Sequence, residues 1–182
     1  MAAIETVIHR DGAGAVSVGA IAREAGISKA SVLYDYGNRS ALLAAYVERW
    51  LEARKAAITA RAERAGTEPD AWLTALLAVA GDVPSEQKRS CALVLSASLA
   101  ESEESRALAR NAFAEDLARV RNEAARPRSA MLAFLALAGL QALEYNGFHH
   151  FSVEERQAIL RDIAVLARTE LAPANNKLET AP

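Results

Sequence analysis

Several features that would direct the fold or location of a protein are scarce in this sequence. Its single cysteine, Cys91, excludes an intrachain disulfide framework. The longest apolar run, residues 130–140, is too short to span a bilayer. No charged segment followed by an apolar core opens the chain, as in a secretory signal, so we expect a cytoplasmic protein. Neither sign of charge dominates, and the net charge of −2 excludes a basic nucleic-acid coat without excluding a local binding motif.

Glycine and proline are also rare, with nine and five among 182 residues, and no stretch alternates apolar and polar residues as a strand does. The periodic segments run at helical spacing, which predicts an all-α protein. We expect an N-terminal domain over residues 1–46, a larger helical domain over 47–172 and a disordered tail over 173–182. The expected helices are 2–11, 18–25, 29–36, 39–65, one with Pro69 in its first turn, 89–99, one ending at Arg126, 128–148 and one opened by a Ser152–Glu155 capping box and ended by Pro173.

Sequence patterns of catalytic and metal sites are missing. No phosphate-binding loop, nucleophile elbow or HExxH motif occurs. His149 and His150 are adjacent and would point about 100° apart on a helix, which makes them a poor metal pair. Cys91 lies in an apolar segment and is better explained as a small buried side chain than as a redox sensor. We therefore expect no enzyme, no cofactor and no metal.

The stretch "EAGISKASVLYDY", residues 24–36, predicts two short helices joined at Gly26. In the second helix, Val32, Leu33 and Tyr36 face inward on a helical wheel, and Ala30, Ser31, Tyr34 and Asp35 face outward. Two such helices with a glycine in the turn fit a helix-turn-helix unit, whose second helix enters the major groove of DNA.

The outward side chains have the chemistry for this task. Ser28 and Ser31 can donate to phosphates or base edges, and Lys29 and Arg39 supply positive charge for backbone contacts. Tyr34 can reach a phosphate or lie against a thymine methyl group. By residue type alone, the same side chains could equally be the solvated face of a small helical subdomain.

Residues 4–46 resemble the DNA-binding domain of the TetR-family repressors. The resemblance lies in "SVGAIAREAGISKASVLYDYGNRSALL": a hydroxyl before the first of the two short helices, the "IA..AG.S" turn, an aromatic pair and a basic residue before "ALL". It implies a homodimeric regulator, most often a repressor, that binds a palindromic operator and is released by a ligand. It also implies DNA contacts by Ser17, Ser28, Lys29, Ser31, Tyr34 and Arg39, with Ala30 on the same face.

The sequence departs from the family pattern at three places. Asp35 stands where a histidine is common, and a carboxylate there would repel phosphate unless it accepts from a cytosine amine. Ser40 replaces a usual glutamate, and Met1 falls inside the first expected helix, where the family normally has more chain. Either the start is misassigned or the protein works without an arm. The alternative function is a helical small-molecule-binding dimer that has lost DNA binding.

The helix expected over 128–148 is apolar nearly all round, so one core cannot cover it. We predict that it meets a second subunit together with the last helix, although a monomer with a central helix remains the alternative. The expected interface comprises Met131, Leu135, Ala138, Ile159, Ile163 and Leu166.

The resemblance further implies a ligand cavity within the helices of the larger domain. Few charges fall on the inner faces, which favours a largely apolar effector. For each candidate lining residue a role in the core explains the residue type better than ligand binding does, and Gln141 and Glu144 could orient a ligand or lie at the subunit interface. The candidates are Trp72, Leu76, Cys91, Leu95, Phe113, Leu117, Phe134 and Tyr145.

Overall fold

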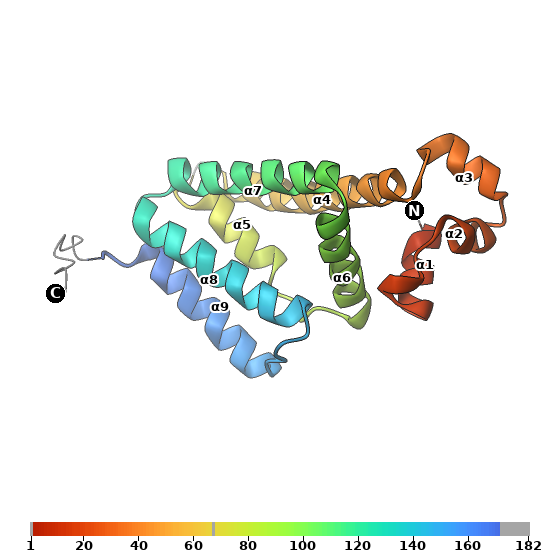
Figure 1. The fold of residues 1–182 in the computed structure, drawn as a ribbon. Helices are drawn as coiled ribbons and strands as arrows, with labels where there is room; N and C mark the ends of the chain where they lie inside the picture. The colour runs from red at the N-terminus through yellow and green to blue at the C-terminus, as the bar shows by residue number, and fades with distance from the viewer. Residues whose placement is uncertain (1, 67, 172–182) are drawn as a thin grey trace, which may run out of the picture.

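The computed structural model describes residues 2–66 and 68–171, and this part of the chain is all-α (Figure 1). It contains nine α-helices and one short 3-10 helix, and the all-α prediction is confirmed. The helices are α1 (Ala2–Asp11), the 3-10 helix (Ala13–Ala15), α2 (Val18–Ala25), α3 (Lys29–Tyr36), α4 (Arg39–Ala65), α5 (Ala71–Val79), α6 (Glu86–Glu101), α7 (Glu103–Glu123), α8 (Pro127–Tyr145) and α9 (Val153–Arg168).

Side-chain caps define the first helices at the expected residues. Ser17, Ser28 and Asn38 each accept a hydrogen bond from a backbone N–H in the first turn of the helix that follows. Gly26 ends α2 in the left-handed conformation at φ 67°, which glycine adopts without steric cost. Local sequence therefore determines where α2, α3 and α4 begin.

Several later boundaries differ from the prediction. Pro69 precedes α5, which begins at Ala71 after Asp70, a residue with φ 65° and no side-chain cap bond. Ser85 caps α6 three residues earlier than expected, and Ser102 alone separates α6 from α7. Helix α9 does begin with the Ser152–Glu155 capping box, but it ends at Arg168, before Pro173. The predicted tail, 173–182, lies outside the described residues.

The helices form two packed groups. Helices α4 and α7 lie side by side, α8 and α9 form a hairpin against them, and α6 crosses between this bundle and α1 (Figure 1). One buried apolar cluster joins α1–α3, the start of α4 and α6, and a second joins the end of α4 to α5, α7, α8 and α9. No helix in the described part of the chain is both long and apolar enough to cross a membrane.

Candidate nucleic-acid interface and ligand cavity

The two short helices α2 and α3 form a rigid corner that projects at one end of the molecule (Figure 1). Within the corner, the amide of Ile27 donates to the carbonyl of Ala22 at 3.0 Å, which closes the turn at Gly26. Val32 on α3 is 2% exposed and packs with Ile21 and Ala22 of α2 in the first apolar cluster. The opposite side of α3 consequently faces solvent.

This outer face carries most of the predicted contact residues. Lys29, Ala30, Ser31 and Tyr34 are exposed, and Tyr34 is 91% exposed because the described residues leave its ring almost uncovered. Ser28 is occupied in capping, since its Oγ accepts from the amide of Ser31 at 3.0 Å and lies 2.9 Å from the Ser31 Oγ. The inward orientation expected for Leu33 is wrong: it is 44% exposed, because α3 is two turns long and only its Val32 stripe reaches α2.

Lys29 folds back over the first turn of α2. A Cβ atom at Gly19 would lie 2.7 Å from the Cε of Lys29, so the absence of a side chain at Gly19 makes room for the lysine stem. Ser17, which caps α2, is exposed beside this turn. The ammonium group therefore sits near the positive end of the α2 dipole, and an anion there would meet both.

The guanidinium of Arg39, which was expected to contact DNA, is instead bound to other groups of this chain. Its Nε donates to the carbonyl of Val16 at 2.9 Å, and its Nη1 pairs with Glu101 at the end of α6. The side chain therefore ties the start of α4 to the segment before α2 and to α6. Sequence could not show this partner, because Glu101 lies 62 residues away.

An apolar cavity of about 380 Å³ lies among α4, α6, α7 and α8, with Val79 of α5 at its edge. Three of the predicted lining residues, Leu95, Phe113 and Tyr145, are in its wall, and so is Gln141. Burial raises the pKa of Tyr145 above its ordinary value, so its hydroxyl remains protonated and able to donate. The residues missed by sequence analysis include Val47, Trp50, Leu51, Arg54, Lys88, Ser96 and Leu99.

The other predicted lining residues lie elsewhere. Leu76 and Phe134 are buried in the second apolar cluster, and Leu117 packs against that cluster. Cys91 is buried against the first cluster next to Tyr46, whose pKa is raised by burial and by a hydrogen bond with Cys91. Each of these four residues fills a core position, which was the alternative explanation.

Trp72 is also a core residue, and it belongs to a buried polar network. Its Nε1 donates to Oδ1 of Asp116 at 3.0 Å, and Nη1 of Arg54 donates to Oδ2 of the same carboxylate at 2.8 Å. Arg119 lies over the indole ring at 3.7 Å. Glu144, a candidate for holding a ligand, is instead 4% exposed and paired with buried Arg156 at 2.8 Å.

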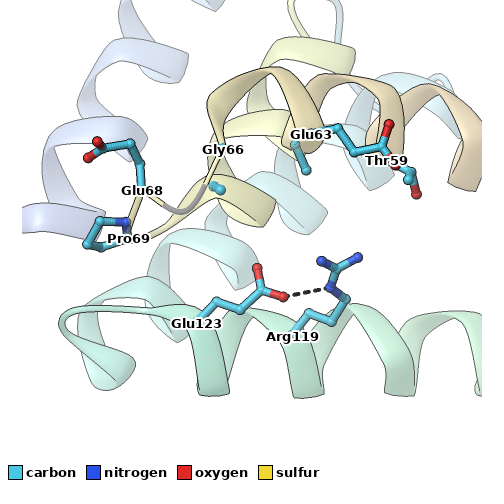
Figure 2. Close-up of a pocket in the computed structure, with 9 residues that line it drawn as sticks. Thr59, Glu63, Gly66, Glu68, Pro69, Arg119 and Glu123 are labelled. Atoms are coloured by element: carbon cyan, nitrogen blue, oxygen red, sulfur yellow. Dashed lines mark hydrogen bonds and ion pairs between the residues drawn. The ribbon is translucent and has the colours of Figure 1, made fainter.

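A second opening, of about 580 Å³, lies at the far end of α4 (Figure 2). Its floor is α7, where Nε of Arg119 pairs with Glu123 at 2.7 Å, and Glu63 of α4 lies across from them. Arg119 and Glu123 pair with each other, and Glu63 and Glu68 add two further acidic side chains to the wall. The cavity lined by Trp50 and Phe113 is the better small-molecule site.

Helix α8 leaves an apolar stripe uncovered, which we call the α8 stripe. It consists of Leu132, Leu135, Ala136, Gly139 and Leu143, all exposed, with Leu135 54% exposed. Of the residues predicted for a dimer interface, Leu135 lies in this stripe and Met131 beside it is half-buried. The remaining four point toward the interior of their own chain. Ala138 lines the cavity, Ile163 is buried, and Ile159 and Leu166 pack on the second cluster.

The apolar cavity and the helix-turn-helix domain share side chains. Val47 of α4 and Leu95 of α6 line the cavity and also belong to the first buried cluster, with Ile4, Val7 and Ile8 of α1. Trp50 and Leu51 line the cavity and pack against the same cluster. A molecule in the cavity would thus touch the residues that hold the DNA-binding helices.

Comparisons with known proteins agree with this architecture. The family model described as "Bacterial regulatory proteins, tetR family" matches residues 1–46, and the one described as "Tetracyclin repressor-like, C-terminal domain" matches residues 70–168. No curated protein matched the chain.

Two solved structures are similar in fold. A protein from Pseudomonas aeruginosa PAO1 assigned as a transcriptional regulator has a TM-score of 0.72 at 16% identity, over 90% of this chain and 86% of its own. A protein from Rhodococcus sp. assigned as a TetR-family transcriptional regulator has a TM-score of 0.63 at 20% identity, over 91% and 95% of the two chains. With both family models matching in order along the chain, this protein belongs to the TetR family of transcriptional regulators, and its N-terminal helices are a DNA-binding domain.

Proposed function

We propose that the protein is a repressor that binds a palindromic operator as a homodimer and releases it when a small molecule fills the apolar cavity. The observation that carries the DNA-binding part is the outer face of α3. Tyr34 is almost fully exposed, Lys29 and Ser31 flank it, and the capped turn at Gly26 fixes the direction of the helix. Such an exposed face on a rigid second helix fits the major groove.

The individual contacts follow from the position of each group. Lys29 and Ser17 lie beside the first turn of α2 and suit a phosphate, and so do the backbone amides of that turn. Ala30, Ser31 and Tyr34 suit base edges or phosphates, and the Ser28 O–H can donate to a phosphate oxygen while its Oγ accepts from the Ser31 amide. For Arg39 we propose a positioning role through Val16 and Glu101, because these groups already occupy its guanidinium.

The homodimer rests on the α8 stripe. Four of its five members are spaced three or four residues apart, so they form one continuous apolar surface on a helix. Ala136 and Gly139 are small enough for a second α8 to approach closely, and Val165 of α9 is 64% exposed. A pair of such hairpins would form a four-helix interface and relate two α3 helices by twofold symmetry.

Release of the operator by a ligand is supported by the side chains that the cavity and the first buried cluster have in common. Because Val47 and Leu95 line the cavity and belong to the buried cluster that contains α1, a ligand that moves α4 or α6 also disturbs the support of the DNA-binding helices. Glu101, at the end of α6, holds Arg39 at the start of α4, which gives the two moving helices a direct link. A tenfold loss of operator affinity needs about 1.4 kcal/mol of preference for the non-DNA state.

The DNA-binding proposal is tested by substituting one of two lysines. Lys29→Ala removes an ammonium group from the proposed interface, whereas Lys55→Ala removes one from the exposed Lys55–Glu115 pair on the body of α4. We expect Lys29→Ala to weaken binding to DNA from upstream of the gene by about tenfold or more and to reduce the salt slope by about two for a dimer. Lys55→Ala should leave both unchanged in fluorescence anisotropy.

Three other results would contradict the proposal. Equal losses from both variants would indicate a general charge effect, and an unchanged Lys29→Ala affinity would remove Lys29 from the interface. If the unsubstituted protein binds no DNA at low salt, the ligand-binding dimer without DNA binding becomes the better account. Circular dichroism of both variants provides the check that the helices are intact.

A further inference from the structure

The charged side chains in the wall of the apolar cavity are all positive. Most of its surface comes from aliphatic and aromatic side chains, among them Trp50, Leu51, Leu99 and Phe113. Among the residues that the structure describes, the charged ones in its wall are Arg54 of α4 and Lys88 of α6, and no described aspartate or glutamate lines it. The cavity thus combines a large apolar area with a positive potential.

Lys88 lies on the cavity face of α6. It is followed at helical spacing by Ala92, Leu95, Ser96 and Leu99, which all line the same cavity. Within residues 2–66 and 68–171, its ammonium group forms no ion pair and no side-chain hydrogen bond. Its charge is therefore free for a ligand.

The guanidinium of Arg54 is held in place by a buried carboxylate, that of Asp116. Asp116 accepts from its Nη1, and Trp72 donates to the same carboxylate, so the guanidinium has a fixed orientation beside the ring of Phe113. Asp116 offsets part of the arginine charge, and the nearby Glu144 is offset by Arg156. Lys88 consequently supplies the uncompensated charge of the cavity.

Neutral donors lie in the same wall. Tyr145 keeps its hydroxyl proton because burial disfavours its ionised form, and Gln141 on the preceding turn of α8 has a side-chain amide. Ser96 of α6 adds a hydroxyl group. Hydrogen-bond donors and a cation in one cavity suit the oxygen atoms of an anion, which accept hydrogen bonds and cannot donate them.

From this geometry we infer that the ligand of the cavity is an amphipathic organic acid, with one carboxylate at Lys88 and an alkyl or aryl body against Trp50, Leu99 and Phe113. The inference rests on the proposed function only in taking this cavity as the effector site. It refines the expectation of a largely apolar effector by adding one carboxylate at Lys88 to an apolar body.

Isothermal titration calorimetry of the full chain without DNA tests this ligand class with three probes of equal length: octanoate, 1-octanol and octylammonium. We expect octanoate to bind about tenfold more tightly than 1-octanol and octylammonium to bind most weakly, since a charge-assisted pair favours only the acid. Lys88→Met keeps the length and apolar character of the stem and removes the charge. It should remove the advantage of octanoate and leave 1-octanol binding unchanged.

Lys55→Met is the matched control, because Lys55 pairs with Glu115 and does not line the cavity. It should leave the order of the three probes unchanged. The inference is overturned if 1-octanol or octylammonium binds as tightly as octanoate, if octanoate shows no saturable binding, or if Lys88→Met weakens all three probes equally. Binding is measured without DNA, so failure of operator binding leaves the ligand class intact. Octanoate that binds without releasing DNA counts against the proposed release alone.

Discussion

At the scale of single residues, buried charge is concentrated at a few paired side chains. Asp116 accepts from both Trp72 and Arg54, and it thereby connects α7 to α5 and α4. Arg156 pairs with Glu144 and also donates to the carbonyl of Gly81 at 2.9 Å, which connects α9 to α8 and to the loop before α6. Removing one partner of such a pair leaves an unsatisfied group in the core.

Asp116→Ala should therefore be strongly destabilising. It leaves the Arg54 guanidinium and the Trp72 indole N–H without their acceptor, and we expect a loss of about 3 kcal/mol in the free energy of unfolding. Urea denaturation followed by circular dichroism measures this loss. Glu115→Ala is the adjacent control: it breaks only the exposed pair with Lys55, so its loss should stay below about 1 kcal/mol. Comparable losses for the two variants would contradict a structural role of the network.

At the scale of secondary-structure elements, the turn between α2 and α3 was fully predictable, because Gly26 and the capping Ser28 are local features. The start of α6 was not predicted, since residue types alone did not show that Ser85, with its extended backbone, accepts from the Lys88 amide as the cap of this helix. The orientation of α8 was not predictable either. A helix with apolar residues on every side has no polar face to set its rotation, so Ala138 and Leu135 could not be assigned to cavity and surface.

In the candidate site, too, local features could be predicted from the sequence and features that depend on tertiary contacts could not. The outward face of α3 followed from helical spacing, whereas the cavity wall needed contacts between helices distant in sequence. Leu95, Phe113 and Tyr145 were among the candidates because they are large and apolar, and Trp72 and Phe134 were included for the same reason. Residue type alone cannot distinguish a cavity wall from a filled core.

The conformation of the turn between α2 and α3 leads to a specific prediction for Gly26. A Cβ there would meet no atom within 4 Å, so Gly26→Ala tests the backbone conformation alone. At φ 67° we expect a loss of about 1 kcal/mol in the free energy of unfolding and weaker operator binding, because strain would shift α3 relative to α2. Gly14→Ala also meets no atom but has no left-handed φ, so it should change stability by less than about 0.5 kcal/mol. Thermal and urea unfolding compare the two; equal effects would exclude backbone strain as the cause.

At the scale of the whole molecule, two cores are joined by α4, whose start lies in the first core and whose end lies in the second. The first holds the DNA-binding helices and the second holds the α8–α9 hairpin, so the proposed operator and dimer surfaces lie on different cores (Figure 1). The cavity lies between them. A homodimer would join two such chains through the second core and leave the first core of each free to move.

Leu135→Glu should disrupt that dimer. The substitution places a charge in the centre of the α8 stripe, where burial against a second subunit would desolvate it. Sedimentation should then give a mass near the 19.4 kDa of one chain, with operator affinity falling because the half-sites are bound independently. Leu93→Glu is the control: Leu93 is 45% exposed on α6, outside the stripe and the cavity wall. A monomeric unsubstituted protein, or dissociation by both variants, would contradict the proposed interface.

The side chains shared by the cavity and the first core restrict how this protein could be redesigned as a biosensor. A change at Val47 or Leu95 made to accept a new compound would also alter the buried cluster that contains α1, so under the proposed mechanism altered specificity there would come with altered operator binding. Ser96, Ala109 and Ala142 line the cavity without belonging to either buried cluster. If the proposed release mechanism holds, a library confined to these three positions would vary the recognised compound while leaving operator binding without ligand unchanged.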